Sequence, residues 1–265
     1  MTGIKQTVFL ILVVFSVVIL TGSNAFGATP YDTTSSDAET DGVNGFRELD
    51  GAKAVSVFQL ANGTNFALVA SYDDDGIQLI NLNNPTNIVA VTAKTDGVSG
   101  YTALDGAADA KSFSIGDKRY GVVVSGIDDG IQLLNMTNPL KPAPLDAEFD
   151  GPNGFSELDG ANSVNVFTLS NGTNYSLVTS YDDDGFQLVN MNDPTAIVAV
   201  DSETDGSNGF TKLDGPSDSA TFSVSGNPHG IITSKDESYF TIINLSDPSN
   251  VTMVKEYDLS SDSIT

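Results

Sequence analysis

Leu49-Asp50-Gly51 begins the pattern that decides the fold, because the same tripeptide returns three more times along the chain. The later copies start at Leu104, Leu158 and Leu213, at intervals of 55, 54 and 55 residues. A fixed period of this length is typical of propellers, solenoids and other repeat arrays. A feature present in every repeat belongs to the scaffold or to a repeated binding surface, whereas chemistry that needs one special residue should appear once.

Each repeat contains four short runs of β-forming residues with turn signals between them. The turn signals of the first repeat are Asn62-Gly63, Asp75-Gly76 and Asn84-Pro85. Its runs are Val55–Leu60, Phe66–Ser71, Ile77–Leu82 and Ile88–Thr92. Four strands in a unit of this length predict an all-β fold, a β-propeller of four four-stranded antiparallel blades. The blades are expected at about 43–94, 95–148, 149–203 and 204–260, which together form one domain from 43 to 260.

The repeats share one register. One position of the first strand is always phenylalanine, at Phe58, Phe113, Phe167 and Phe222. The third strand is nearly continuously apolar, which is typical of an inner strand covered on both faces. The fourth strand of the second repeat is expected to hold Pro142 and Pro144, which predict an outer edge strand because proline cannot donate to a β-ladder.

The third strand with its following turn resembles the LVIVD repeat. Gln187-Leu188-Val189-Asn190 continues into Met191-Asn192-Asp193-Pro194, and that repeat likewise has a Leu-Val-Ile-Val-Asp core followed by a turn with proline. Asparagine stands where the family often has aspartate, at Asn81, Asn135, Asn190 and Asn244. The resemblance covers about residues 43–257. It implies an exported microbial β-propeller-like surface protein, with no established reaction.

The start of the chain has the pattern of a secretory signal. Lys5 precedes the apolar run Thr7–Leu20, and small residues follow at Ser23 and Ala25. We expect a signal peptide over 1–25 and a flexible polar lead-in over 26–42. Cleavage after Gly27 and retention as an anchor are the alternatives. The protein is then expected to be secreted or held at the cell surface, with no membrane span after signal removal.

Composition narrows the classes of partner. The chain has 35 acidic residues against 11 basic ones, a formal net charge of −24, and no cysteine. So negative a protein is a poor ligand for nucleic acid, because phosphate binding depends on Lys and Arg. The expected partners are cations and a cell-envelope protein or glycan. With no strand-forming segment ahead of the first blade, the ring is expected to close by packing, to stay open, or to be completed by a second copy as a homo-oligomer.

Acidic loops on one face of the predicted propeller are candidate calcium ligands. Blade topology places the loop between blades and the hairpin between the second and third strands on the same face. Carboxylates on such loops are ligands that Ca²⁺ prefers, although Asp-Gly is also a good hairpin turn. Structural or solvated roles are the alternative. The fourth repeat has Lys235-Asp236-Glu237-Ser238 and lacks the motif. The candidates are Asp73, Asp74, Asp75, Asp128, Asp129, Asp182, Asp183 and Asp184 in the hairpins, and Asp50, Asp105, Asp159 and Asp214 at the mouth of the first strands.

Six asparagines lie in Asn-x-Ser/Thr sequences and are candidate glycosylation sites. Turns rich in Asn and Thr also produce such sequences by chance. The six are Asn62, Asn135, Asn171, Asn174, Asn244 and Asn250.

Catalysis has little support in the sequence. The one histidine, His229, aligns with Phe66, Tyr120 and Tyr175, so it is expected to fill an aromatic scaffold position. No nucleophile-base arrangement or phosphate loop is present. We therefore predict a non-catalytic interaction or structural module, with Ca²⁺ as the one candidate ligand ion. The alternative is a carbohydrate-binding or glycoside-cleaving propeller, in which Tyr72 and Tyr181 would stack on sugar rings.

Overall fold

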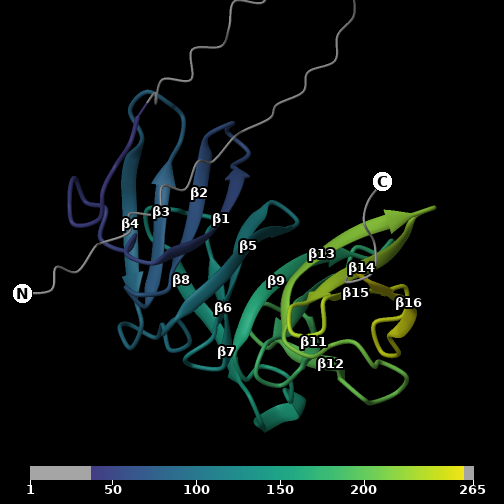
Figure 1. Cartoon of the computed structure of the whole chain (residues 1–265). Coiled ribbons are helices and arrows are strands. Elements are labelled where there is room, and N and C mark those ends of the chain that lie inside the picture. Colours follow the sequence, from purple (N-terminus) through teal and green to yellow (C-terminus); the bar gives the residue numbers. More distant parts are fainter. Residues whose placement is uncertain (1–36, 260–265) are drawn as a thin grey trace, which may run out of the picture. The chain divides into compact units, whose positions relative to one another are not determined.

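The computed structural model describes residues 37–259 and shows four sheets of four antiparallel strands each. The predicted signal peptide and the first part of the lead-in lie outside the described residues. Within each sheet the strands are in sequence order, so each blade is a simple meander (Figure 1). The predicted all-β fold of four four-stranded blades is therefore confirmed.

The strand bounds follow the runs expected from the sequence. The first blade contains β1 (Ala52–Gln59), β2 (Asn65–Ser71), β3 (Gly76–Asn81) and β4 (Val89–Thr95). The second contains β5 (Ala107–Ile115), β6 (Lys118–Ser125), β7 (Gly130–Asn135) and β8 (Ala143–Phe149). The third contains β9 (Ala161–Thr168), β10 (Asn174–Ser180), β11 (Gly185–Asn190) and β12 (Val198–Thr204), and the fourth contains β13 (Pro216–Val224), β14 (Asn227–Ser234), β15 (Tyr239–Asn244) and β16 (Thr252–Asp258).

One short 3₁₀ turn, Pro152–Gly154, interrupts the β structure ahead of the third blade. Between residues 37 and 259 no helix is long and apolar enough to cross a membrane. Pro144 lies in β8, at the outer edge of its sheet, where proline is tolerated, whereas Pro142 lies just before that strand.

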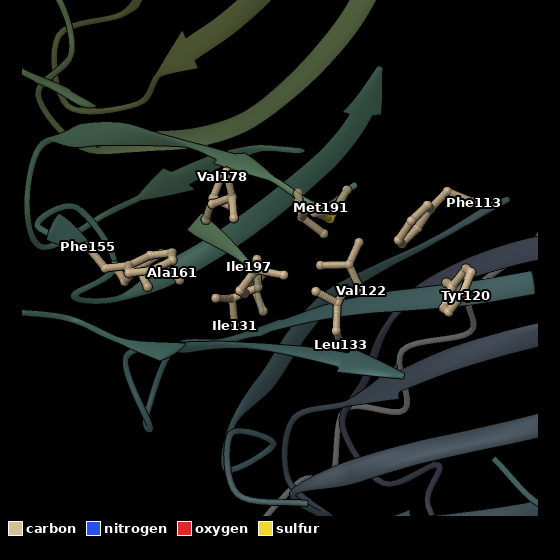
Figure 2. Packing of buried hydrophobic residues seen from close by; sticks show 14 residues of the cluster. Phe113, Tyr120, Val122, Ile131, Leu133, Phe155, Ala161, Val178, Met191 and Ile197 are labelled. Atoms are coloured by element: carbon tan, nitrogen blue, oxygen red, sulfur yellow. The ribbon is translucent and has the colours of Figure 1, made fainter. Parts of the chain in front are cut away.

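The core consists of apolar layers between consecutive blades. Between the second and third blades, Phe113, Val122 and Leu133 of one sheet share a buried cluster with Val178 of the next sheet and with Phe155, which precedes that sheet (Figure 2). Equivalent layers join the first blade to the second and the third to the fourth. Each blade is therefore buried mainly by its neighbours, as in other repeat proteins.

The ring is not closed within residues 37–259. The first strands of consecutive blades lie side by side, β1 against β5, β5 against β9 and β9 against β13. No comparable contact joins β1 to β13 in this part of the chain. The first and fourth blades thus each keep one face that no other blade covers.

The segment before the first strand contacts the first blade. Asp37 accepts a hydrogen bond from the backbone N–H of Ile88 at 2.6 Å. Asp146 and Asp201 accept the same bond from Ile197 and Val251, across the interfaces between the second and third blades and between the third and fourth. Asp37, which was expected in the flexible lead-in, thus takes the place of the outer-strand aspartate of a preceding blade.

Candidate functional site

The acidic hairpins and the Leu-Asp-Gly loops meet on one face of the blades, as the topology predicted. The second carboxylate of each hairpin accepts a hydrogen bond from the backbone N–H of the loop aspartate. Asp74 accepts from Asp50 at 2.7 Å, and Asp183 accepts from Asp159 at 2.8 Å. Asp128 likewise accepts from the N–H of Asp105 at 2.9 Å. These bonds hold the loop between blades against the hairpin of the same blade.

The last hairpin aspartate reaches the next blade instead. Asp129 accepts from the N–H of Gly160 at 2.9 Å, and Asp184 accepts from Gly215 at the same distance. Asp75 makes the equivalent bond to Gly106 at 3.1 Å. In the fourth blade Ser238 stands in this position and shares its left-handed backbone conformation. These carboxylates are therefore links between consecutive blades.

The glycine of the tripeptide leaves room for the first hairpin aspartate. Gly160 has a φ of +65°, and a Cβ there would lie 2.5 Å from the Asp182 carboxylate. Gly51 packs in the same way on Asp73. A side chain at either glycine would displace the hairpin, which explains why Leu-Asp-Gly keeps its last residue in every repeat.

Burial and neighbouring negative charges raise the pKa of several of these carboxyl groups. Burial, with the charges of nearby aspartates, raises the pKa of Asp128 and of Asp183 to about 6. The same causes raise the pKa of Asp74 and of the loop aspartates Asp105, Asp159 and Asp214. A bound cation would relieve this repulsion.

Two glutamates lie beneath this face and do not follow the repeat. Glu48 and Glu157 precede the tripeptides of the first and third blades, and each side chain is only 6% exposed. In each, Oε1 accepts a hydrogen bond from a threonine hydroxyl, of Thr95 or Thr204. Oε2 is buried with no hydrogen-bond partner among the described residues. Burial raises the pKa of both carboxyls from 4.5 to about 7.

The even-numbered blades have other residues in that position. The second blade has Ala103, and the fourth has Lys212, which pairs with Glu237 at 2.9 Å. At this position the first and third blades resemble each other more than they resemble their neighbours, so glutamate recurs in every second blade and not in every blade.

Among the described residues, the predicted calcium site on this face has no matching cluster of ligands. In the part of the chain from 37 to 259, no group of three or more His, Cys, Asp or Glu side chains is arranged to hold a metal ion. The candidate calcium ligands instead make the backbone contacts described above. Calcium binding therefore stays a prediction.

The candidate glycosylation sites differ in accessibility. Asn62, Asn171 and Asn250 are exposed, whereas Asn135 and Asn244 are half-buried at the ends of β7 and β15. Asn174 is 5% exposed, and its Nδ2 donates to the carbonyl of Ser114 in the preceding blade at 3.2 Å. Because Nδ2 is the atom a glycan would modify, Asn174 is the least accessible of the six candidates in the folded protein.

The aromatic residues proposed for sugar stacking are engaged within the protein. Lys53 Nζ lies 3.5 Å from the centre of the Tyr72 ring. The Tyr181 hydroxyl donates to Asp236 at 2.6 Å. His229 stacks on Phe222 with ring centres 5.5 Å apart, as Tyr120 stacks on Phe113 in the second blade. The histidine thus fills the aromatic scaffold position expected for it.

A groove along the first strands is a second candidate site, which the sequence did not predict. It has a volume of about 500 Å³ and draws residues from all four blades. Its lining is mostly polar. The polar residues are Lys53, Asp109, Lys111, Asn162, Ser163, Ser217 and Asp218.

Several groove residues also join the blades. Asp109 pairs with Lys111 at 2.8 Å and accepts from the backbone N–H of Val164 at 3.0 Å. Asp218 accepts from the Ser163 hydroxyl at 3.0 Å. Lys53 is exposed as a residue, but partial loss of water around its amine lowers the pKa of that amine.

The signal for this groove was present in the sequence as a break in the repeat. The position of Ala54 in the first strand is Asp109, Ser163 and Asp218 in the later blades. The phenylalanine position of the same strand is strictly repeated, whereas the positions that line the groove differ from blade to blade. Residues that differ from blade to blade near the centre of a repeated scaffold can form a site that occurs only once in the protein.

Comparison with known proteins gives the fold and no more. No protein-family model matches the chain, and no curated protein matches it in sequence. A solved structure of a protein from Lactobacillus plantarum is similar, with a TM-score of 0.56 at 10% identity over 81% of this chain and 57% of that one. An exo-β-1,3-galactanase from Phanerochaete chrysosporium has a TM-score of 0.51 at 12% identity, over 85% and 53%.

A putative 6-phosphogluconolactonase from Bacteroides fragilis has a TM-score of 0.52 at 12% identity, over 76% of this chain and 54% of that one. The chain thus spans little more than half the length of these three structures. At such identities the likeness supports a propeller-type fold and carries no activity across.

Proposed function

We propose that this chain is a non-catalytic interaction module that is exported to the cell surface. The proposal includes membership of the LVIVD-repeat family and stabilisation of the acidic face by cations. The signal-like start of the chain and its strong negative charge support an extracellular, cation-rich setting.

The observation that carries the proposal is the engagement of the repeated carboxylates. A glycoside-cleaving site needs two carboxyl groups that flank the substrate, one able to give a proton. Here the aspartates of the acidic face accept hydrogen bonds from backbone N–H groups of their own or the next blade. The carboxyls with the highest pKa, Glu48 and Glu157, are buried beneath that face. These carboxyl groups are therefore better suited to holding the blades together than to catalysis.

The groove favours carbohydrate binding as a second candidate function. Hydroxyl, amide, ammonium and carboxylate groups line about 500 Å³ of space, and such groups can hydrogen-bond sugar hydroxyls. The similar fold of an exo-β-1,3-galactanase is consistent with this candidate and does not establish it.

A glycan array combined with a hydrolysis assay separates the candidates. The interaction module predicts no turnover of any glycoside, and galactose-containing oligosaccharides are the first to test. Binding lost in Lys53→Ala and kept in Lys118→Ala, an exposed lysine outside the groove, would support the carbohydrate candidate. Turnover abolished by Asp109→Asn or Asp218→Asn would overturn the non-catalytic proposal.

A further inference from the structure

The repeated phenylalanine of the first strand shows that the fourth blade lacks a partner. Phe58, Phe113 and Phe167 are 4%, 4% and 7% exposed, because the following blade covers each of them. Phe222 holds the same position in the fourth blade and is 40% exposed. The residue type is retained although no blade covers it within the described residues.

The rest of that face follows the same pattern. Ile231 and Ile242 of the fourth blade are partly exposed. Their equivalents in the third blade, Leu177 and Leu188, are fully buried against the fourth blade. The uncovered face thus keeps the apolar residues with which the third blade packs on its neighbour.

The first blade carries the opposite half of such an interface. Val55 and Val57 of β1 are 46% and 45% exposed. The equivalents of Val55 are Ala110 and Val164, which are fully buried by the preceding blade. Beside them, Phe46 and Val69 form a buried cluster that matches Phe155 and Val178 of the third blade (Figure 2).

Of two polar contacts between blades, the uncovered faces keep the residues for only one. The Ser56 hydroxyl donates to the Ser112 hydroxyl at 3.2 Å, across the first interface. Ala220 and Val57 hold these two positions in the uncovered faces, so both positions are small or apolar there. Asn174 donates to the carbonyl of Ser114 in the preceding blade, and the first blade has Asn65 in the position of Asn174.

We propose that the fourth blade of one chain packs on the first blade of a second copy, so that two chains form one ring of eight blades. A second copy fits these faces because three interfaces with the same residue pattern already join the blades within one chain. Propellers have four to eight blades, so a ring closes with two copies and not with three. The fourth blade of each copy meets the first blade of the other, and a twofold axis relates these two contacts, so together they form an isologous interface.

The proposed contact is limited to the inner strands. At the outer edge of the first blade, Asp37 of the same chain already provides the acceptor for Ile88. The fourth blade has Lys255 where Asp146 and Asp201 stand, and lysine cannot accept that bond. The proposal therefore places β13–β15 of one copy against β1 and β2 of the next. It goes beyond the proposed function, because an enzyme and a binding module can assemble in the same way.

A cysteine pair tests this contact directly, since the chain has no cysteine of its own. Val57→Cys and Ala220→Cys introduce thiols at the positions of the Ser112–Ser56 pair. The matched control is Ser56→Cys with Ser112→Cys, which should form a disulfide within one chain because the two hydroxyl oxygens lie 3.2 Å apart. Both proteins are oxidised and run on a non-reducing gel, and their mass in solution is measured by light scattering.

The proposal predicts a covalent dimer for the Val57→Cys, Ala220→Cys protein and a mass of twice one chain in solution. A mixture of the two single variants should also form a disulfide-linked pair, whereas Val57→Cys alone should not. Phe222→Asp should reduce the mass to that of one chain with an unchanged circular dichroism spectrum. An intramolecular disulfide would show that four blades close on themselves, and a monomer without any disulfide would show two free faces; either result overturns the proposal.

Discussion

The buried glutamates give the chain a pH dependence that a single amide substitution should remove. Glu157 is 6% exposed, its Oε2 has no hydrogen-bond partner among the described residues, and burial raises its pKa to about 7 from 4.5. The folded state therefore holds this proton more tightly than the unfolded state. The stabilising effect is fully present below pH 4.5 and is lost as the pH rises through 7.

The magnitude follows from the two pKa values. A rise from 4.5 to about 7 corresponds to a free energy of about 3 kcal/mol at most for this carboxyl. Glu157→Gln keeps the shape and cannot ionise, so it should match the native protein at pH 4.5. At pH 8 it should be the more stable of the two by about 2–3 kcal/mol. Glu48→Gln should act in the same direction, because burial raises the pKa of Glu48 to about 7 as well.

Urea unfolding followed by circular dichroism at pH 4.5, 6 and 8 measures this effect. Asp117→Asn, an exposed carboxylate in the turn after β5, is the control and should leave the pH dependence unchanged. If Glu157→Gln is no more stable than the native protein at pH 8, the carboxyl is not a buried, unpaired acid there. A cation bound beside it would have that effect, because it would favour the ionised form.

Three further predictions follow from the packing and the hydrogen bonds. Phe113→Ala should destabilise the protein by about 3–5 kcal/mol in urea unfolding. Phe222→Ala, at the copy of this position that no blade of the same chain covers, should cost under about 1 kcal/mol when single chains unfold, and more when the proposed dimer unfolds. Equal costs for the two variants in single chains would show that the fourth blade is covered within its own chain. Gln132→Leu should lower the free energy of unfolding by about 2–4 kcal/mol, because buried Gln132 accepts a hydrogen bond from the N–H of Thr102 and donates one to the carbonyl of Asp146. The control Gln59→Leu, at an exposed position of β1, should change stability little. Calcium should raise the melting temperature more than magnesium or sodium does at matched ionic strength. Asp183→Asn should reduce this gain if the site lies in the hairpin, and Asp159→Asn should reduce it if the site lies at the start of the first strand. Equal responses to the three salts would leave these aspartates with structural roles only.

The strands and their register could be predicted because both are written in local sequence. Asp75-Gly76 and Asn84-Pro85 mark turns, and a phenylalanine every 54 or 55 residues fixes which face of the first strand is buried. Ring closure could not be predicted in this way. It depends on the angle between blades, which results from many side chains in each layer, and no single residue reports it.

The acidic face was predicted in location but not in its contacts. Alternation of the strands places the hairpin and the tripeptide loop on one side, and Asp74 does lie against the N–H of Asp50. Which carboxylate bonds within its blade and which crosses to the next depends on distances of a few ångströms. The glutamates were visible as a break in the repeat, since Glu48, Ala103, Glu157 and Lys212 hold one position. Their burial, however, follows from the fold alone.

Repetition itself separates the residues that hold the fold from those free to bind. Asp129 and Asp184 recur with every hairpin of the first three blades and join one blade to the next. Lys53, Lys111 and Asn162 occur once each at their positions and line a groove that all four blades share. Substituting a repeated residue should therefore lower stability wherever it is made, whereas substituting an unrepeated groove residue should change binding in one place. The groove is thus the part of this scaffold where a ligand can be recognised by residues that the other blades do not duplicate.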